Sequence, residues 1–344
     1  MHIAEFDYDL PDELIAQQPL AKRDASRMLV LDRQSGTWTD SGFHEFPAYL
    51  RANDVVVVNN SRVIPARLSG RRHETGGAVE VFLVRELEPR IWEALVRPGG
   101  RLKEGARVVF GNEELIGELL DEPGRELRRV RFESERPFEQ VLAELGSTPL
   151  PPYIKRPGGD STADRERYQT VYSKTPGAIA APTAGLHFTD TILEQVRERA
   201  SVVEVTLHVG YGTFEPVRVD DLDQHSVSSE HFSITEAAAG TINHARETGG
   251  RVIVVGTTTM RALESSASES DRVVADSGEA SLTIRPGYRF RIADALLTNF
   301  HLPRSSLLVL VSAFAGHELV LRAYAHAVQQ RYRFYSYGDC MLIL

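Results

Sequence analysis

The chain has 344 residues, of which 42% are hydrophobic and 25% are charged. This composition supplies apolar material for about two cores at roughly 150 residues per domain and excludes disorder as the main state. The net charge of −9 means that any contact with a polyanion must depend on a local basic surface. One cysteine, Cys340, excludes an internal disulfide and a cysteine-based zinc site, so we expect a cytoplasmic protein. Its apolar runs are far shorter than the ~20 residues of a membrane span, and we expect no membrane contact.

The first buried strand is predicted at residues 55–58, a run of four valines. After it, between about residues 62 and 150, short strand patterns separated by Gly, Pro and Asn turns indicate a small all-β barrel. We interpret residues 61–155 as an insertion into a discontinuous α/β domain made of residues 1–60 and 156–344; a tandem of two domains is the alternative. The barrel strands are predicted at residues 78–84, 92–96, 107–110, 115–120 and 128–132.

The α/β pattern resumes after the insertion. Capping residues predict helices at 191–199, 236–248 and 317–331, and apolar runs predict buried strands at 252–255 and 307–311. Strands that alternate with helices indicate the α/β class, with the helices covering the sheet.

The insertion is less acidic than the rest of the chain. Residues 62–155 contain 16 basic and 16 acidic side chains, so the whole negative charge falls on the α/β part. Phosphate groups are therefore attracted more to the insertion, although a solvated charged surface would have the same composition. The candidate RNA-binding side chains here are Arg62, Arg67, Arg71, Arg101 and Lys103.

Residues 181–189, APTAGLHFT, join a Pro/Gly loop to a capped helix. Such a junction presents free backbone N–H groups to an anion, but it is also an ordinary helix start. We select Thr183 and Gly185 as binding candidates and His187 as a catalytic candidate.

In residues 207–216, LHVGYGTFEP, a strand is interrupted by two glycines that allow a ligand to approach the backbone. His208 could equally be a core histidine and Glu215 a surface carboxylate. Nearby His225, Glu230 and His231 lack a clear ligand spacing, and we expect no metal site. The candidates here are His208, Tyr211 and Glu215 for catalysis, and Gly210, Gly212 and Thr213 for binding.

Two later polar segments lie next to predicted strands. Residues 256–261, GTTTMR, lie where open α/β sheets bind ligands, and residues 297–306, LTNFHLPRSS, form a polar loop before the predicted strand at 307–311. Helix capping and surface charge are the alternative readings. The binding candidates are Gly256, Thr257, Thr258, Thr259, Arg261, Asn299, His301 and Arg304. Motifs of serine hydrolases, P-loop enzymes and zincins are absent.

These segments together resemble the S-adenosylmethionine:tRNA ribosyltransferase-isomerase family of queuosine biosynthesis. The resemblance runs nearly end to end and includes FDYDLPDELIAQQPL, NDVVVVNNSRVIPARLSG, GSTPLPPYIKR, APTAGLHFT, LHVGYGTFEPV, GTTTMRALES, TNFHLPRSSLLVLVSAFAG and YRFYSYGDCMLI. It implies a three-layer α/β domain with an inserted barrel. It also implies transfer of the ribosyl group of S-adenosylmethionine to 7-aminomethyl-7-deazaguanine at the tRNA wobble position, giving epoxyqueuosine, adenine and methionine. The donor is a substrate, and no prosthetic group is implied.

This chemistry needs a base to remove a proton beside the sulfonium and an acid to protonate adenine. On chemical type we select His187 and His208 as that pair, assisted by Tyr211 and Glu215. Arg331 and Arg333, beside Tyr332, Phe334 and Tyr335, are a second candidate tRNA contact, although a core strand would look similar. A tRNA methyltransferase and a non-catalytic RNA-binding protein are the competing hypotheses. We expect a monomer.

Overall fold

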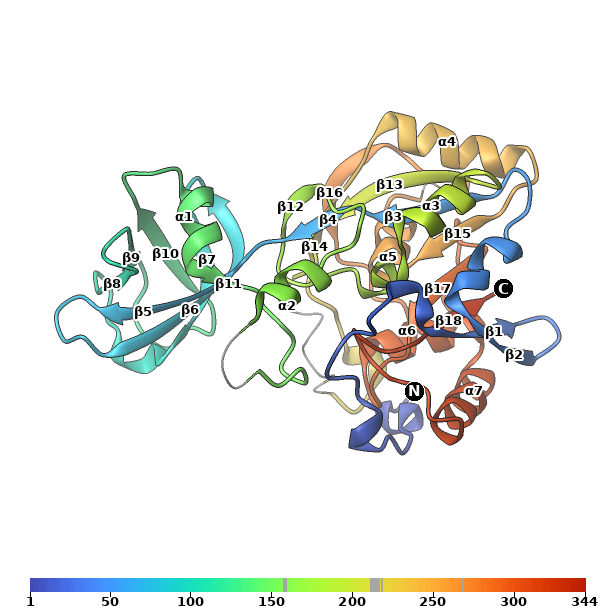
Figure 1. The fold of residues 1–344 in the computed structure, drawn as a ribbon, viewed down its shortest axis with the longest axis horizontal. Coiled ribbons are helices and arrows are strands. Elements are labelled where there is room, and N and C mark those ends of the chain that lie inside the picture. Colours follow the sequence, from blue (N-terminus) through green and yellow to red (C-terminus); the bar gives the residue numbers. More distant parts are fainter. Residues whose placement is uncertain (157–159, 211–216, 218, 268) are drawn as a thin grey trace.

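The computed structural model describes residues 1–156, 160–210, 217, 219–267 and 269–344. They form a large α/β domain and a β-barrel that stands to one side of it (Figure 1). The chain enters the barrel through β4 (Ser61–Val63), which pairs in parallel with β12 (Thr175–Ala178) of the returning chain. The predicted fold class, an α/β domain with an all-β barrel, is confirmed.

A sheet of nine strands forms the centre of the α/β domain. In order across the sheet, its strands are β16 (Asp276–Ala280), β14 (Glu230–Ile234), β13 (Ser201–Leu207), β3 (Val55–Asn59), β15 (Val252–Val255), β17 (Ala295–Asn299), β18 (Cys340–Ile343), β1 (Arg27–Asp32) and β2 (Thr37–Gly42). The four strands β13, β3, β15 and β17 are mutually parallel, so their carboxyl ends meet at one edge. Strand β18 runs antiparallel to β17, and it begins at the same edge.

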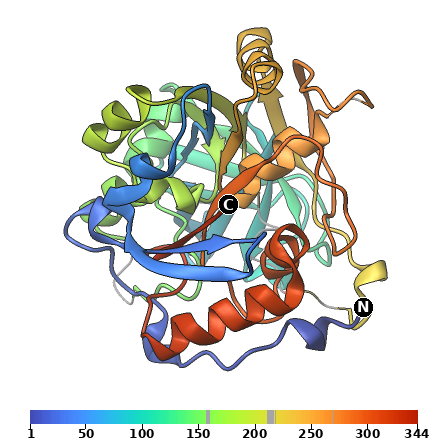
Figure 2. The same cartoon turned by 90° about the vertical axis from the view of Figure 1, so that its right-hand side faces the viewer.

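Side chains alternate between the two faces of the sheet. Val55 and Val57 pack into one apolar core, whereas Val56 and Val58 pack into another on the opposite face. The first core is covered by α4 (Glu236–Glu247), α5 (Thr257–Ser265), α6 (Ser306–Ala315) and α7 (His317–Gln329), and the second by α3 (Asp190–Arg197) and the 3₁₀ helix η4 (Phe43–Tyr49). Figure 2 shows α3 (green) and α7 (red) on different sides of the domain, which therefore has three layers.

The barrel closes on itself around a separate apolar core that includes Val81, Val130 and Phe132. In β10, residues alternate strictly between buried and exposed, as expected for a strand with one face toward a core. The strands of the barrel, in order, are β5 (Arg67–Arg72), β6 (Ala78–Glu88), β7 (Ile91–Arg97), β10 (Arg128–Glu133), β9 (Leu115–Leu119) and β8 (Arg107–Phe110). Strand β8 pairs with β5 and so closes the barrel. Helix α1 (Phe138–Leu145) packs on the barrel, and β11 (Gly146–Ser147) pairs with β5.

Short helices complete the chain. They are η1 (Ile3–Phe6), η2 (Asp12–Leu14), η3 (Arg23–Ala25), η5 (Gly99–Arg101), α2 (Thr162–Arg167), η6 (Thr183–His187) and η8 (Leu222–Gln224).

The helix predictions are confirmed to within two residues, but one predicted strand is wrong. Residues 307–311 belong to α6, a helix that is apolar on nearly all sides and is capped by Ser305. A short continuous apolar run has no periodicity that distinguishes a buried strand from a buried helix. The cap at Ser305, whose Oγ accepts a hydrogen bond from the amide of Leu308 at 3.2 Å, was the available signal.

Candidate active site

A cavity of about 360 Å³ lies at the edge of the sheet where β13, β15 and β17 end. This is the edge at which open α/β sheets bind their ligands, and the volume is within the ~300–1,000 Å³ range of small-molecule sites. The walls come from residues 152–153, 168, 180–184, 209, 256–258, 298–307 and 335–336. Segments that are far apart in the sequence therefore meet here. Each of the four stretches selected above contributes to the wall, the stretch at 207–216 through Val209 alone among its described residues.

Seven of the predicted binding residues line this cavity: Thr183, Gly256, Thr257, Thr258, Asn299, His301 and Arg304. Three further binding candidates, Thr259, Gly210 and Gly185, do not line the cavity. The hydroxyl of Thr259 donates to the carbonyl of Val255 at 2.6 Å, and the amide of Gly210 donates to Glu230 at 2.9 Å. Gly185 is packed so tightly that a Cβ there would lie 2.0 Å from the Tyr172 hydroxyl. These three residues shape the surroundings of the cavity rather than its wall.

Two helices begin at the cavity wall. Gly256 precedes α5 with φ +91° and ψ 149°, a conformation that favours glycine, and its neighbours Thr257 and Thr258 line the cavity. Helix α6 begins at the opposite side, where Ser305 and Ser306 line the wall. Helix N-termini present unpaired N–H groups and a positive dipole end. The described lining contains no carboxylate, so the cavity favours an anionic group.

His187 lies behind this wall and is almost fully buried. The amide Nδ2 of Asn299 donates to the carbonyl of Tyr335 at 3.0 Å and to His187 Nε2 at 3.3 Å. Nε2 is then an acceptor, so the proton is on Nδ1, which lies 2.7 Å from the Ser26 hydroxyl. Burial, with the nearby charge of Arg23, lowers the pKa of His187 to about 4. The ring is therefore neutral at physiological pH, and both of its nitrogens are engaged.

His208 lies outside the cavity. Its ring stacks on His231, with centroids 6.2 Å apart, and packs against the backbone of Gly177 in β12. The Nδ1 atom is buried and has no hydrogen-bond partner among the residues that the structure describes. Burial and the neighbouring His231 lower the pKa of His208. Alternation along the strand explains this placement, because the next residue, Val209, is the one that lines the cavity.

Arg261 is held by the protein itself. Its guanidinium forms a buried ion pair with Glu230 and donates to the carbonyls of Ala280, at 2.6 Å, and Ser228, at 3.2 Å. This side chain fixes α5 to the edge strands β14 and β16. It is absent from the wall of the large cavity.

His301 and Arg304 reach the cavity from the loop after β17. His301 Nε2 lies 2.9 Å from the Thr298 hydroxyl, and burial lowers the His301 pKa to about 3, so this ring is also neutral. Arg304 has φ +55° and its guanidinium pairs with Asp7. Tyr8 donates from its hydroxyl to the His301 carbonyl at 2.5 Å. The N-terminal segment therefore holds the loop in place.

Sequence reasoning missed the aromatic wall. Tyr153 and Tyr335 line the cavity with their ring centroids 4.1 Å apart, and the Tyr153 hydroxyl lies 2.6 Å from the Ser336 hydroxyl. The Tyr335 hydroxyl is buried without a partner. Tyr335 has φ +73°, which is unusual for a residue other than glycine, and its neighbour Gly338 has no room for a Cβ. The strings PPY and YSYG were the available signals.

Four candidates, Tyr211, Gly212, Thr213 and Glu215, lie outside the described residues. Within the described ranges, no group of three or more His, Cys, Asp or Glu side chains is placed to hold a metal ion. Among the same residues no single helix is long and apolar enough to cross a membrane, although α6 and α7 pass that test as a pair bent by 115°.

The RNA-binding candidates of the barrel are spread over its surface. Arg67 pairs with Glu80 at 3.0 Å, and Arg71 and Lys103 are exposed. Arg62, on β4, is exposed and donates to the Ser173 hydroxyl at 3.4 Å. The side chain of the remaining candidate, Arg101, is outside the described part of the structure.

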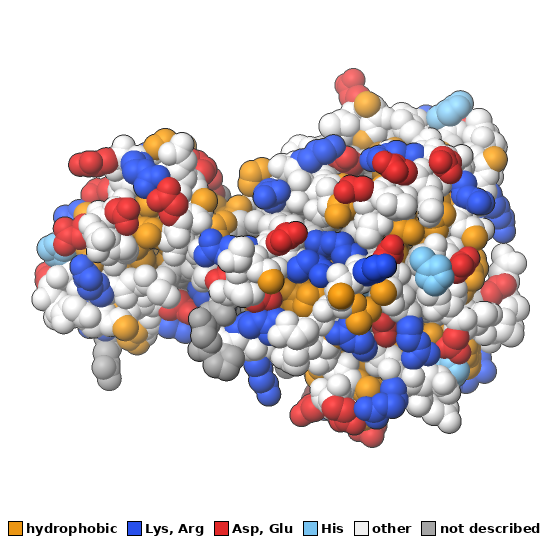
Figure 3. Space-filling view, viewed as in Figure 1, with side chains coloured by type: hydrophobic (Ala, Val, Ile, Leu, Met, Phe, Trp, Pro, Cys, Tyr) orange, Lys and Arg blue, Asp and Glu red, His pale blue; other side chains and the backbone are white. Residues whose placement is uncertain are grey.

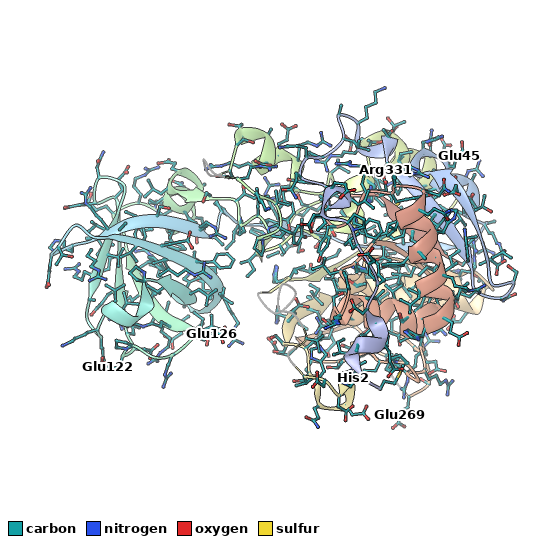
Figure 4. The ribbon with its side chains drawn as sticks, turned by 90° about the horizontal axis from the view of Figure 1, so that it is seen from below. His2, Glu45, Glu122, Glu126, Glu269 and Arg331 are labelled. Atoms are coloured by element: carbon teal, nitrogen blue, oxygen red, sulfur yellow. The ribbon has the colours of Figure 1, made fainter. Side chains whose placement is uncertain are left out.

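The C-terminal candidates lie on the α/β domain, as the position of Arg331 in Figure 4 shows. Arg331 pairs with Glu13 at 3.7 Å, and Arg333 donates to the carbonyl of Gln18. The rings of Tyr332 and Phe334 are completely buried, so bases cannot stack on them in this fold. The predicted aromatic stacking by these two residues is wrong, because they belong to the core.

Comparison with known proteins gives one consistent result. A family model described as "Queuosine biosynthesis protein" matches residues 3–343. Proteins named S-adenosylmethionine:tRNA ribosyltransferase-isomerase from Symbiobacterium thermophilum and Desulforamulus reducens are 50% and 47% identical over 345 residues, covering 100% of each chain. The crystal structure of S-adenosylmethionine tRNA ribosyltransferase from Thermotoga maritima is 36% identical, with a TM-score of 0.56, over 99% of this chain and 100% of that one.

The comparisons thus identify an enzyme, and the structure shows that it consists of an α/β domain and a barrel. The chain belongs to the queuosine biosynthesis protein family, which confirms the resemblance read from the sequence. Its named relatives are S-adenosylmethionine:tRNA ribosyltransferase-isomerases.

Proposed function

We propose that the protein transfers the ribosyl group of S-adenosylmethionine to 7-aminomethyl-7-deazaguanine at the tRNA wobble position and isomerises it. The products are epoxyqueuosine-tRNA, adenine and methionine. The observation that carries this proposal is the cavity at the carboxyl edge of the sheet, with helix starts and tyrosine rings in its wall and no described carboxylate. S-adenosylmethionine acts as a substrate, and the absence of a prosthetic group stays a prediction.

The wall suits the two charged groups of the donor. The methionine carboxylate is placed at the N-termini of α5 or α6, where Thr257, Thr258 and Ser306 offer N–H and hydroxyl donors. The sulfonium cation is placed against the faces of Tyr153 and Tyr335, because aromatic rings attract cations without a counter-charge. Asn299, His301 and Arg304 remain the candidates for contacts to the base or its phosphate.

Ribosyl transfer requires a proton to leave the carbon beside the sulfonium and adenine to be protonated as it departs. His187 is neutral, as a base must be, but it reaches the cavity only if its hydrogen bond to Asn299 opens. His208 remains the other member of the proposed pair, assisted by Tyr211 and Glu215; because it lies outside the cavity, it acts there only if its ring leaves the stack with His231. The alternative for His187 is a positioning role, in which it fixes the orientation of the Asn299 amide.

The pH dependence of the first step separates these roles. If His187 is the base, exchange of the donor's 5′ hydrogen into D₂O should be constant from pH 8 to 5 and fall as the pH drops through about 4, since protonation removes the base. His187→Ala should slow this exchange at least 100-fold. Equal exchange rates in the wild type and His187→Ala would leave His187 with the positioning role only.

Replacement of Tyr335 tests the aromatic wall. We expect Tyr335→Ala to weaken S-adenosylmethionine binding about tenfold, since a desolvated cation–ring contact contributes about 1–2 kcal/mol. Tyr335→Phe keeps the ring and should bind the donor as tightly as the wild type. Equilibrium dialysis with labelled donor measures both. Loss of affinity in Tyr335→Phe would assign the effect to the hydroxyl group instead of the ring.

One assay tests the reaction itself. The protein is incubated with tRNA that carries the deazaguanine precursor and with S-adenosylmethionine labelled in its ribose. We expect the label to appear in tRNA together with free adenine and methionine. Label retained in S-adenosylhomocysteine, with a methyl group on tRNA, would identify a methyltransferase. Intact donor in the presence of bound tRNA would identify a non-catalytic RNA-binding protein.

We further propose that residues 61–155 act as one module that helps to hold tRNA, and residues 1–60 and 156–344 as the catalytic domain. Support comes from the separate apolar core of the barrel. The monomeric state also stays a proposal, and light scattering of the purified protein tests it.

A further inference from the structure

Two half-buried arginines line a small hollow next to the large cavity, and a third, Arg333, lies near it with its backbone packed against Gly338 of the lining. The hollow, of about 20 Å³, is lined by Arg23, Arg167 and His187, and Ser336 lines both it and the large cavity. Arg333 lies close enough for its charge to lower the pKa of His187, after burial and Arg23. Figure 3 shows Lys and Arg side chains gathered on this face, between α2 and the N-terminal segment.

Among the described residues, the hydrogen bonds of these three guanidinium groups all go to backbone carbonyl oxygens. Arg23 donates to the carbonyls of Leu186, at 3.1 Å, and Glu166, at 3.2 Å. Arg167 donates to the carbonyl of Leu20 at 2.7 Å, and Arg333 to that of Gln18. Within the ranges that the structure describes, none of the three forms a salt bridge. Arg167 Nε and Arg333 Nη1 are buried donors without any partner.

Other arginines in the same part of the structure, in contrast, are paired with carboxylates. Arg156 pairs with Asp164 at 2.9 Å, and Arg165 pairs with Asp160 at 3.1 Å. Near the hollow, the Asp339 carboxylate accepts hydrogen bonds from the backbone amides of Arg27 and Arg333, and Glu166 is exposed. Burial and the charge of Arg167 lower the pKa of Arg23. Glu166 and Asp339 offset part of this positive charge from a distance, but no described carboxylate forms a salt bridge with the three guanidinium groups, so a bound anion would stabilise them further.

We propose that Arg23, Arg167 and Arg333 form a subsite for a backbone phosphate of the RNA, at the nucleotide whose base enters the large cavity. This inference rests on the proposed function. The hollow has room for one water-sized group, so it takes a single phosphoryl oxygen while the guanidinium groups hold the others. Because Ser336 borders both spaces, the base and its own phosphate reach their sites together. The contact is independent of sequence and sets the register of the anticodon.

The test compares RNA binding with donor binding. Arg167→Gln should raise the KM for tRNA and the Kd for a tRNA transcript about tenfold, as expected for one charge-assisted contact. The slope of log K against log[salt] should become shallower by about 0.7. The affinity for S-adenosylmethionine should not change. Arg199→Gln, at the opposite edge of the sheet, is the matched control and should alter neither affinity.

A modified RNA locates the phosphate. A methylphosphonate at the phosphate that flanks the wobble nucleotide should weaken wild-type binding about tenfold and should have no further effect in Arg167→Gln. Equal weakening in both proteins, or an unchanged tRNA Kd in Arg167→Gln, overturns the subsite. If Arg167→Gln lost affinity for S-adenosylmethionine but not for tRNA, the arginines would be assigned to the methionine carboxylate, and the phosphate subsite would also be overturned.

Two further measurements separate an effect on the phosphate contact from an effect on folding or on catalysis. Arg333→Gln repeats the test if Arg167→Gln lowers the melting temperature, because Arg333 has a single backbone contact of its guanidinium in the described structure. RNA binding is measured without donor, so it reads out the subsite even if the wild type transfers no ribose. A wild-type protein that binds tRNA through these arginines but transfers no ribose would reject the proposed function and leave the phosphate contact valid.

Discussion

Gly256→Ala should reduce kcat/KM for S-adenosylmethionine about 100-fold. The glycine precedes α5 with φ +91° and ψ 149°, a backbone conformation that costs any other residue about 1–3 kcal/mol. A Cβ at this position has room, since its closest contacts are 3.7 Å away. The strain is therefore relieved by backbone rotation, which moves the N–H groups of α5 at the cavity. A displacement near 1 Å is enough for a loss of this size.

Gly316→Ala provides the control for backbone strain. Gly316 precedes α7 with φ +93° and ψ 127°, and nothing lies within 4 Å of the position of its Cβ. Both variants should unfold at lower denaturant concentration by a similar amount. Only Gly256→Ala should lose donor affinity and activity, because only this glycine lines the cavity. An equal loss of activity in both variants would mean that the N-terminus of α5 has no role in binding.

The sequence singled out three stretches at the cavity edge for different reasons: residues 181–189 as a loop before a helix, residues 256–261 as a turn after a strand, and residues 297–306 as a polar loop. Three of the selected stretches, around Thr183, Thr257 and Asn299, line one cavity. Local patterns are sufficient for this, since parallel strands bring their carboxyl ends together. The family resemblance gave the activity, which no spacing of residues could specify.

Side-chain direction could not be predicted. His187 and Arg261 have the residue types expected at a catalytic site, but neither lines the large cavity. His187 is hydrogen-bonded to Asn299, and Arg261 is paired with Glu230. Which side of a turn a residue faces depends on packing between distant segments. The same reason explains why Tyr153 was missed and why Tyr335, named only as part of a tRNA contact, was not assigned to the cavity wall. The two rings come together from positions 182 residues apart in the sequence.

Counting charged residues along the sequence also did not identify the arginines that are available to bind phosphate. The sequence drew attention to arginine-rich stretches of the barrel, but Arg67 is paired with Glu80 there. Arg23 and Arg167, which form no salt bridge within the described residues, lie outside these stretches. Whether an arginine is available for phosphate depends on the acceptors around it, and these are set by the tertiary structure.

Asp54→Ala should lower the free energy of unfolding by about 3–5 kcal/mol. The Asp54 carboxylate is buried just before β3 and accepts hydrogen bonds from the amides of Arg51, at 2.8 Å, and Arg251, at 2.9 Å. The Arg251 guanidinium lies 2.6 Å away and would lose its counter-charge. Urea unfolding followed by circular dichroism measures the change. Donor binding by the folded fraction should persist, since Asp54 lies at the sheet edge opposite the cavity.

The pH dependence of stability identifies the ionised carboxylate as the cause. Burial alone would raise the pKa of Asp54, but the hydrogen bonds from Arg251 outweigh it, so the pKa is lowered below its value in the unfolded chain. The folded protein then binds fewer protons than the unfolded chain, and this stabilisation is lost as the pH falls below about 4. Asp54→Ala should lack that part of the pH profile. Glu247→Ala, which removes an exposed partner of Arg272, should leave both the stability and the profile nearly unchanged. Matching losses in the two variants would show that the Asp54 contact contributes no more than a surface pair.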